Sequence, residues 1–335
     1  MNLDSRTSEL ASKHGANWKT ISGAKVLVGK GGKIIAGAGG KFANLADMEN
    51  KGATATNGGS FAFTDKSSME FWVGADKTNE MASLVNGAGL GELWGNHANE
   101  VSMIGDEKGR GYYDPYNKAI VFDRSKITVG NKESYQSVIH EMSHAIDYRI
   151  GDKQNPNAYG YENFSYRYKD GAFDKAIRAD VDARMKTRQA EMKVRLKELA
   201  KQHKDPKELT IKLAEEGFIA SKDLAKTQAK IEQGKLPSIN ADAVGRSISK
   251  DLAAQGSAIR TVSDIYGGAT ANKVFGGYGH GAAYWKRDKT NLTSEAFASM
   301  SASKACSKAQ YEAIKEYFPT AHKVYEEMVA DMAKL

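Results

Sequence analysis

The 335-residue sequence contains one cysteine, Cys306, five prolines and no long apolar run. A single cysteine excludes an intramolecular disulfide and a cysteine-based zinc cage, and it favours a reducing compartment. Few prolines argue against long disordered segments. The first 15 residues lack the apolar core of a signal peptide, and no segment approaches the roughly 20 apolar residues of a membrane span. We therefore expect a folded protein with no cleaved signal and no membrane span.

Acidic residues are fewer than basic ones, 41 against 48, which leaves a net charge of +7. Such an excess suits contact with nucleic acid or with an acidic partner. Here, however, the basic residues are mostly lysines mixed with carboxylates, without arginine clusters or an aromatic stacking platform. We therefore expect nucleic acid to be at most a secondary partner.

Composition divides the chain into four segments. They are a glycine-rich N-terminal segment at 1–60, the first half of a folded domain at 61–172, a charged helical arm at 173–239, and the second half of the domain at 240–335. Within the first segment, two short β-like runs around a Gly-Gly pair predict a hairpin or a docking arm in residues 24–42. A phosphate-binding loop is the alternative, but the segment lacks the Gly-Lys-Ser/Thr ending that such a loop needs.

Local patterns predict the elements of the folded domain. Residues 60–74 predict a strand, residues 78–94 predict a helix and a loop, and residues 118–123 form a second predicted strand. Apolar residues at helical spacing predict a helix at about 133–149 with a glycine stop at Gly151. A further helix is expected at about 293–303. The helix at about 133–149, which contains both histidines of the motif described below, therefore follows soon after the strand at 118–123.

The arm has its own pattern. Residues from about 173 to 235 are dense in Lys, Arg, Glu, Ala and Leu, with apolar positions three or four apart, and Asp205-Pro206 interrupts them. This pattern predicts a solvated helical hairpin. A nucleic-acid-binding helix is the alternative interpretation.

The segment VIHEMSHAIDY, residues 138–148, carries the most specific signal. His140 and His144 lie four residues apart, one turn along the same face of a helix, so both imidazoles can reach one point. Glu141 is rotated by about 100° and reaches a water rather than the metal. With seven histidines and 21 glutamates in the chain, about 0.01 such motifs are expected by chance. The pattern predicts a Zn²⁺ site with Glu141 as general base.

Zinc needs a third protein ligand. Glu295 is the best candidate because its carboxylate stands among apolar neighbours in SEAFASM and calls for a cation. An exposed glutamate in the first turn of a helix is the alternative interpretation. His280 is the next candidate, either as a ligand or as a substrate-binding residue. Tyr278 and Tyr284 flank His280, and either hydroxyl could stabilise an oxyanion.

Two further residues have roles that follow from their positions. Asp147 lies seven residues after His140 on the same helix face, where it could accept the outer ring N–H of a ligand histidine. Cys306 has no base nearby in the sequence, so we expect a small buried side chain rather than a nucleophile.

These motifs resemble a known family. HEMSHAID, followed much later by SEAFA, resembles the gluzincin branch of the zincin metallopeptidases and is similar to the catalytic domain of anthrax lethal factor. The resemblance covers the two motif-bearing helices. It implies that His140, His144 and Glu295 are zinc ligands and that Glu141 is the base. Tyr284 and Tyr278 lie 11 and 17 residues before Glu295, a departure that leaves the family's catalytic tyrosine without an assigned position.

A second resemblance is broader. Residues 263–285, 294–303 and 312–329 resemble the C-terminal zincin-like region of tailed-phage minor head proteins, and residues 24–42 resemble glycine-rich segments of phage head morphogenesis proteins. This resemblance implies that the protein belongs to a virion or a prophage, with phage virion proteins as partners.

Together these features predict an α+β fold. Its zincin-like domain would contain a small twisted sheet and an active-site helix, and a long charged helical insertion would interrupt it. The expected function is a zinc-dependent metallopeptidase, phage- or prophage-encoded and virion-associated, that cleaves a protein substrate in the virion or the host cytoplasm. Two alternatives stay open. One is a structural virion protein with a zinc-stapled or relic site, and the other is a delivered effector that contacts nucleic acid through its basic arm.

Overall fold

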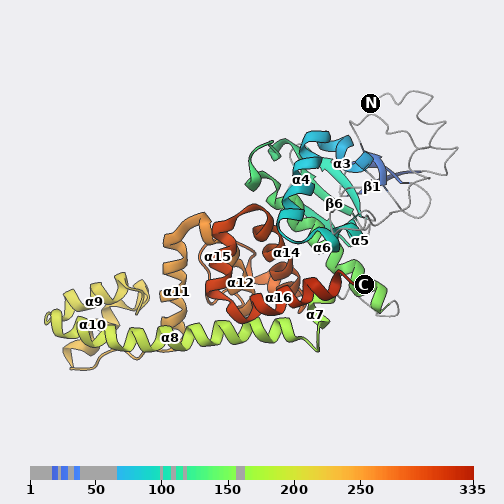
Figure 1. Ribbon diagram of the computed structural model, residues 1–335. Coiled ribbons are helices and arrows are strands. Elements are labelled where there is room, and N and C mark those ends of the chain that lie inside the picture. Colours follow the sequence, from blue (N-terminus) through green and yellow to red (C-terminus); the bar gives the residue numbers. More distant parts are fainter. Residues whose placement is uncertain are drawn as a thin grey trace. The chain divides into compact units, whose positions relative to one another are not determined.

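The computed structural model describes the strand residues 17–21, 24–28 and 34–37, and then residues 66–98, 101–106, 111–115, 119–155 and 163–335. Most of these residues are helical, and the rest include two three-stranded sheets, so the broad α+β class is confirmed (Figure 1). The zincin-like topology stays a prediction.

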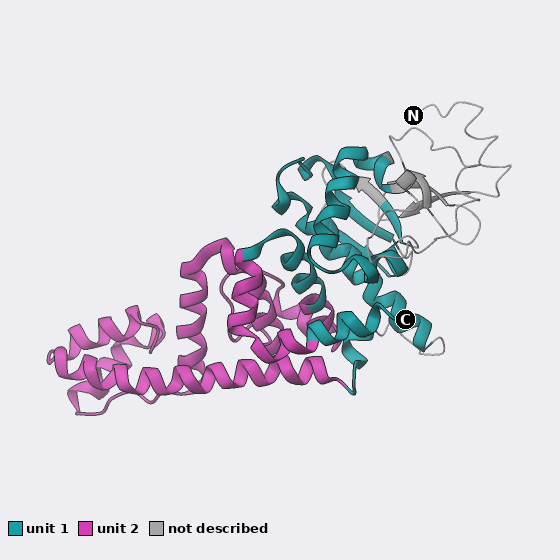
Figure 2. Cartoon of the chain, viewed as in Figure 1, with its two compact units in different colours: residues 1–170, 297–308, 325–335 teal, residues 171–296, 309–324 magenta. Residues whose placement is uncertain are grey.

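The chain divides into two compact units (Figure 2). Unit 1 comprises residues 1–170, 297–308 and 325–335, and unit 2 comprises residues 171–296 and 309–324. The division into four segments predicted above stays a prediction.

Both sheets lie in unit 1. In the first, β1 (Asn17–Ile21), β2 (Ala24–Val28) and β3 (Ile34–Gly37) pair antiparallel in that order, and the β2–β3 pair confirms the predicted hairpin. The second sheet has the order β4 (Ser102–Asp106), β6 (Ala119–Asp123), β5 (Tyr112–Asp114). Its central strand β6 pairs parallel with β4 and antiparallel with β5, and it confirms the strand predicted at 118–123.

Among the residues that the structure describes before residue 170, five helices belong to unit 1. They are α3 (Lys66–Val73), α4 (Ala75–Gly87), α5 (Gly91–His97), α6 (Gln136–Gln154) and α7 (Phe164–Arg167). The strand predicted at 60–74 is wrong for residues 66–73, and residues 60–65 lie outside the described part. Met69 and Trp72 are buried three residues apart, which is the spacing of one helix face. The aromatic residues of this segment are favourable in strands, but the helical spacing prevails.

Helix α6 follows a 3₁₀ turn at Lys132–Tyr135 and confirms the helix predicted at about 133–149, while its role in an active site stays a prediction. The predicted stop at Gly151 is wrong, because α6 continues to Gln154. Ile150 and Gly151 are both buried, and tertiary packing outweighs the roughly 1 kcal/mol that a glycine costs inside a helix.

Unit 2 begins with the predicted helical arm. It consists of α8 (Ala172–Gln202), α9 (Pro206–Glu215) and α10 (Leu224–Glu232). The chain breaks where the sequence predicted, because Asp205 caps α9 by accepting a hydrogen bond from the backbone N–H of Glu208 and Pro206 occupies the first turn. Unit 2 continues with α11 (Ala241–Gln255), α12 (Arg260–Thr270) and α13 (Ala282–Arg287).

Three C-terminal helices complete the chain: α14 (Asn291–Cys306), α15 (Lys308–Tyr317) and α16 (Pro319–Met332). Helix α14 confirms the helix predicted at 293–303. Its residues 291–296 belong to unit 2 and its residues 297–306 to unit 1. The remaining short elements are 3₁₀ turns, at Arg124–Lys126, Ser221–Asp223 and Gly256–Ile259. No helix in the described ranges is both long and apolar enough to cross a membrane.

Each unit has its own core. In unit 1, α6 packs on β6, and Val138, Ile139 and Met142 are buried together with Ile120 and Phe122. Each such side chain contributes roughly 1.5–3 kcal/mol by leaving water. This packing fixes α6 on the sheet and leaves its histidine-bearing face to be filled by other groups.

Candidate metal centre

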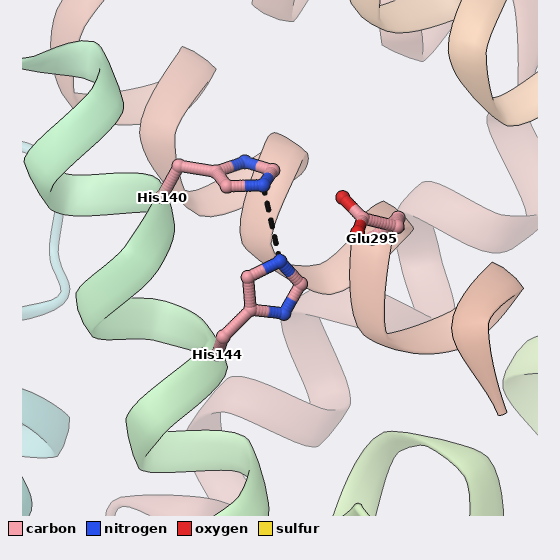
Figure 3. Close-up of side chains that lie close together, drawn as sticks. All are labelled: His140, His144 and Glu295. Carbon is pink, nitrogen blue, oxygen red and sulfur yellow. Dashed lines mark hydrogen bonds between the residues drawn. The ribbon is translucent and has the colours of Figure 1, made fainter. Parts of the chain in front are cut away.

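The two histidines of α6 lie as their spacing predicts. The Nε2 atoms of His140 and His144 are 3.1 Å apart, and the two rings are nearly perpendicular, at 86° (Figure 3). Two nitrogen ligands bound tetrahedrally to zinc, each at about 2.05 Å, would be about 3.3 Å apart. The observed separation therefore fits one edge of a zinc coordination tetrahedron.

Glu295 of α14 groups with these histidines. Each of His140, His144 and Glu295 offers one ligand atom, and these atoms all lie within 4.8 Å of one another. The carboxylate of Glu295 is 4% exposed, and a buried carboxylate is costly without a positive charge beside it. Two imidazoles and one carboxylate form a donor set typical of catalytic zinc sites, so the residues present fit a zinc ion.

Glu141, the predicted base, is buried beside the start of β5. A Cβ atom built on Gly111 would lie 3.4 Å from Oε1 of Glu141 and 2.4 Å from Oγ of Ser137. The Cβ atom would thus clash with the Ser137 hydroxyl but meet the Glu141 carboxylate at ordinary contact distance. The backbone at Gly111, just before β5, therefore passes close to Glu141.

Asp147 has a different set of partners from the one predicted. Its carboxylate accepts hydrogen bonds from the backbone N–H of Ser165 (2.7 Å) and from the Ser165 hydroxyl (2.6 Å), rather than from a histidine ring. Burial raises the pKa of Asp147 to about 7, while the bonds to Ser165 and the charge of His144 act in the opposite direction. Asp147 thus anchors the short helix α7 to α6.

A second group of side chains, which also includes Glu295, lies within unit 2. Ligand atoms of Asp264, His280 and Glu295 lie within 4.8 Å of one another. The Tyr284 hydroxyl donates a hydrogen bond to Oε1 of Glu295, and Nε2 of His280 lies 3.8 Å from the same oxygen. The rings of His280 and Tyr284 are stacked, with centroids 4.1 Å apart. His280, the alternative ligand, is therefore a neighbour of Glu295.

The loop that carries His280 is fixed by α12. Oδ1 of Asp264 accepts the backbone N–H of His280 (2.7 Å), and Nδ1 of the His280 ring lies 3.1 Å from Oδ2. The φ angle of Gly279 is +121°, and a Cβ atom there would lie 2.2 Å from Oδ1 of Asp264. The Asn272 amide and the Trp285 indole N–H both donate to the His280 carbonyl. The ring orientation of His280 is thereby set.

The two candidate tyrosines differ. The Tyr278 side chain is 39% exposed, its carbonyl accepts a hydrogen bond from Ser263, and its hydroxyl makes no hydrogen bond within the described residues. Tyr284 is the one whose hydroxyl reaches Glu295. The sequence interpretation missed Asp264, although it is an isolated carboxylate beside the apolar Ile265 and Tyr266, the same signal that singled out Glu295.

Comparison with the models of known protein families, with curated proteins and with solved structures gave no significant match for this chain. The functional argument therefore depends on the chemistry and geometry of the residues themselves.

Proposed function

We propose that the protein is a zinc-dependent metallopeptidase. The observation that carries this proposal is the grouping of His140, His144 and Glu295, with ligand atoms all within 4.8 Å. Glu141 supports it as well, because a zinc site that only holds the fold together has no need of a carboxylate next to a ligand histidine.

In this proposal each side chain has one task. Zinc, when bound by His140, His144 and Glu295, supplies a Lewis acid that makes water more acidic and polarises a carbonyl group. Glu141 takes a proton from the attacking water and returns it to the leaving amine. The Tyr284 hydroxyl donates its one proton to Glu295 in the structure, and in this proposal it turns to the carbonyl oxygen of the substrate as that oxygen becomes negative.

The substrate in this proposal is a protein. The resemblance of residues 263–285 and 294–303 to phage minor head proteins suggests virion proteins as the first substrates to test. A virion-associated enzyme of phage or prophage origin is the context that we propose on that ground.

The proposal is tested by metal content and peptide hydrolysis measured on the same variants. Purified without chelator, the wild type should hold about one zinc per chain. His140→Gln should lose it, and Glu295→Gln should hold less. His203→Gln is the matched control, because this histidine pairs with Glu208 at 2.8 Å on the arm, and it should keep the zinc.

Hydrolysis separates an enzyme from a structural zinc protein. Glu141→Gln should keep its zinc but cleave a quenched-fluorescent peptide library at least about 100-fold more slowly, the usual loss for a general base. No zinc in the wild type would refute the proposal. Equal hydrolysis by Glu141→Gln and wild type would refute the role of Glu141, and zinc without any hydrolysis would favour the structural alternative.

A further inference from the structure

The positive charge of the protein is concentrated in one part of unit 2. Residues 184–235, which we call the basic hairpin, comprise the second half of α8 with α9 and α10 (Figure 1). They contain 14 basic and 8 acidic residues, a net charge of +6, while the whole chain carries +7. The rest of the protein is therefore nearly neutral, and a partner attracted by charge would meet this hairpin first.

Most carboxylates of the hairpin are already paired. Arg188 bridges Glu191 and Asp251 of α11, and Arg195 bridges Glu198 and Glu216. Glu208 pairs with His203 and Glu215 with Lys212. Arg195 thus ties α8 to the end of α9, and Arg188 ties α8 to α11 outside the hairpin, which suits the fixed geometry of the guanidinium group.

The exposed lysines of α8 are arranged differently. Lys186, Lys193, Lys197 and Lys201 are all exposed, and within the residues that the structure describes they form no ion pair. At 100° per residue they occupy an arc of about 80° on α8, and at 1.5 Å per residue they span about 22 Å. The buried Met192, Leu196 and Leu199 lie roughly 130° away around the helix. We call these four lysines the lysine stripe.

The side chains on and around the lysine stripe indicate which kind of partner it fits. Phe218 is the only aromatic residue of the hairpin and is 3% exposed, so no platform exists on which unpaired bases could stack. The exposed large apolar side chains of the hairpin are Val194, 60% exposed and next to the stripe on α8, and Ile211, 44% exposed on α9, and two separate side chains do not form an apolar patch. A protein interface needs an apolar centre, and a membrane-surface helix needs an apolar face. A straight row of flexible ammonium groups suits the phosphates of a double helix, whose strands each carry one charge per about 3.4 Å.

We propose that the lysine stripe of α8 binds duplex nucleic acid through its phosphates, without base specificity. Lys226 and Lys230, four residues apart on α10 and both exposed, form a second short row that can add contacts. The proposal does not depend on the metal centre. In a virion-associated enzyme it would keep the protein on packaged or delivered DNA.

Fluorescence anisotropy with a labelled 30-base-pair DNA tests the proposal. The full-length wild type should bind, with an affinity that falls steeply as salt is raised. A quadruple variant replaces the four lysines of the stripe by Gln, at Lys186, Lys193, Lys197 and Lys201. In this variant the slope of log affinity against log salt should be less steep by about 3.6, at about 0.9 per phosphate contact. The affinity at low salt should fall by about tenfold or more.

The matched control removes the same charge elsewhere. The control variant replaces four exposed lysines that lie outside the hairpin by Gln: Lys132, Lys273, Lys308 and Lys323. Its slope of log affinity against log salt should be nearly that of the wild type. Circular dichroism should show equal helix content in all three proteins. The proposal is overturned if the wild type does not bind duplex DNA, or if the two quadruple variants lose the same amount of affinity for it. Tighter binding to single-stranded DNA, to polyglutamate or to anionic vesicles would also overturn it.

Discussion

The hydroxyl group of Tyr284 in α13 donates a hydrogen bond to Oε1 of Glu295 in α14, the carboxylate that groups with His140 and His144. A ligand carboxylate held by a second residue binds metal with its orientation set in advance. Tyr284 can therefore act on the candidate metal centre through Glu295, besides any direct role toward a substrate.

The first prediction concerns this hydrogen bond. Tyr284→Phe removes the donor and should weaken zinc binding about 10-fold or more, as loss of such outer partners does in other metal sites. Competition with a chelator of known affinity measures the change. Tyr278→Phe is the control, because that hydroxyl makes no hydrogen bond within the described residues. Unchanged zinc affinity together with lost hydrolysis would instead assign the Tyr284 hydroxyl to the reaction alone.

His97 should make the stability of the protein depend on pH. Its side chain is 2% exposed, Nε2 lies 3.3 Å from the carbonyl of Met332, and burial lowers the pKa of His97 below its usual value of 6.5. The unfolded chain therefore binds a proton more readily than the folded one. Stability should fall as pH drops through about 6.5, by at most about 1.4 kcal/mol per pH unit for one proton.

His97→Gln removes this titration. Urea unfolding at pH 7.5 and pH 5.5 should show a smaller difference in the free energy of unfolding for the variant than for the wild type. The comparison within each protein separates the pH effect from any constant loss due to repacking. The same pH dependence in both proteins would mean that His97 is not the responsible group.

Asp180 of α8 should stabilise the start of α16. Its Oδ2 atom accepts hydrogen bonds from the backbone N–H groups of Thr320 (2.9 Å) and Ala321 (2.8 Å), and the residue is 7% exposed. Asp180→Ala leaves two donors in the first helical turn, of which that of Ala321 is buried, without this partner, so the free energy of unfolding should fall by about 1–2 kcal/mol. Denaturant unfolding measures the loss. Asp180→Asn, which keeps an oxygen acceptor, should lose less.

Cys306 should be chemically inert in the folded protein. It is 6% exposed, and burial, reinforced by the nearby negative charge of Glu133, raises the pKa of its thiol to about 12. The reactive thiolate is then almost absent at pH 8. Iodoacetamide should label the native protein far more slowly than the urea-unfolded protein, as read by mass. Rapid labelling of the native form would show that the residue is accessible, and because the chain has no other cysteine the result is unambiguous.

The sequence by itself determined the local features. The spacing of His140 and His144 fixes two imidazoles on one face of α6, because a helix repeats every 3.6 residues and no distant contact is needed. The break between α8 and α9 is local in the same way, because Asp205 caps the start of α9 and Pro206 has no backbone N–H to continue the preceding helix. Where two local signals conflict, as in residues 66–73 and at Gly151, the sequence pattern alone gave the wrong element.

Only the tertiary structure decided which distant groups meet. Glu295 stands about 150 residues after His144, and although Asp264 also stands beside apolar residues, nothing in the sequence indicated that it would meet His280 and Glu295. Asp147 was predicted to accept a hydrogen bond from a ligand histidine, but its carboxylate accepts hydrogen bonds from Ser165 instead. Such pairings depend on how helices pack, and packing is set by many weak apolar contacts over the whole unit rather than by any short pattern.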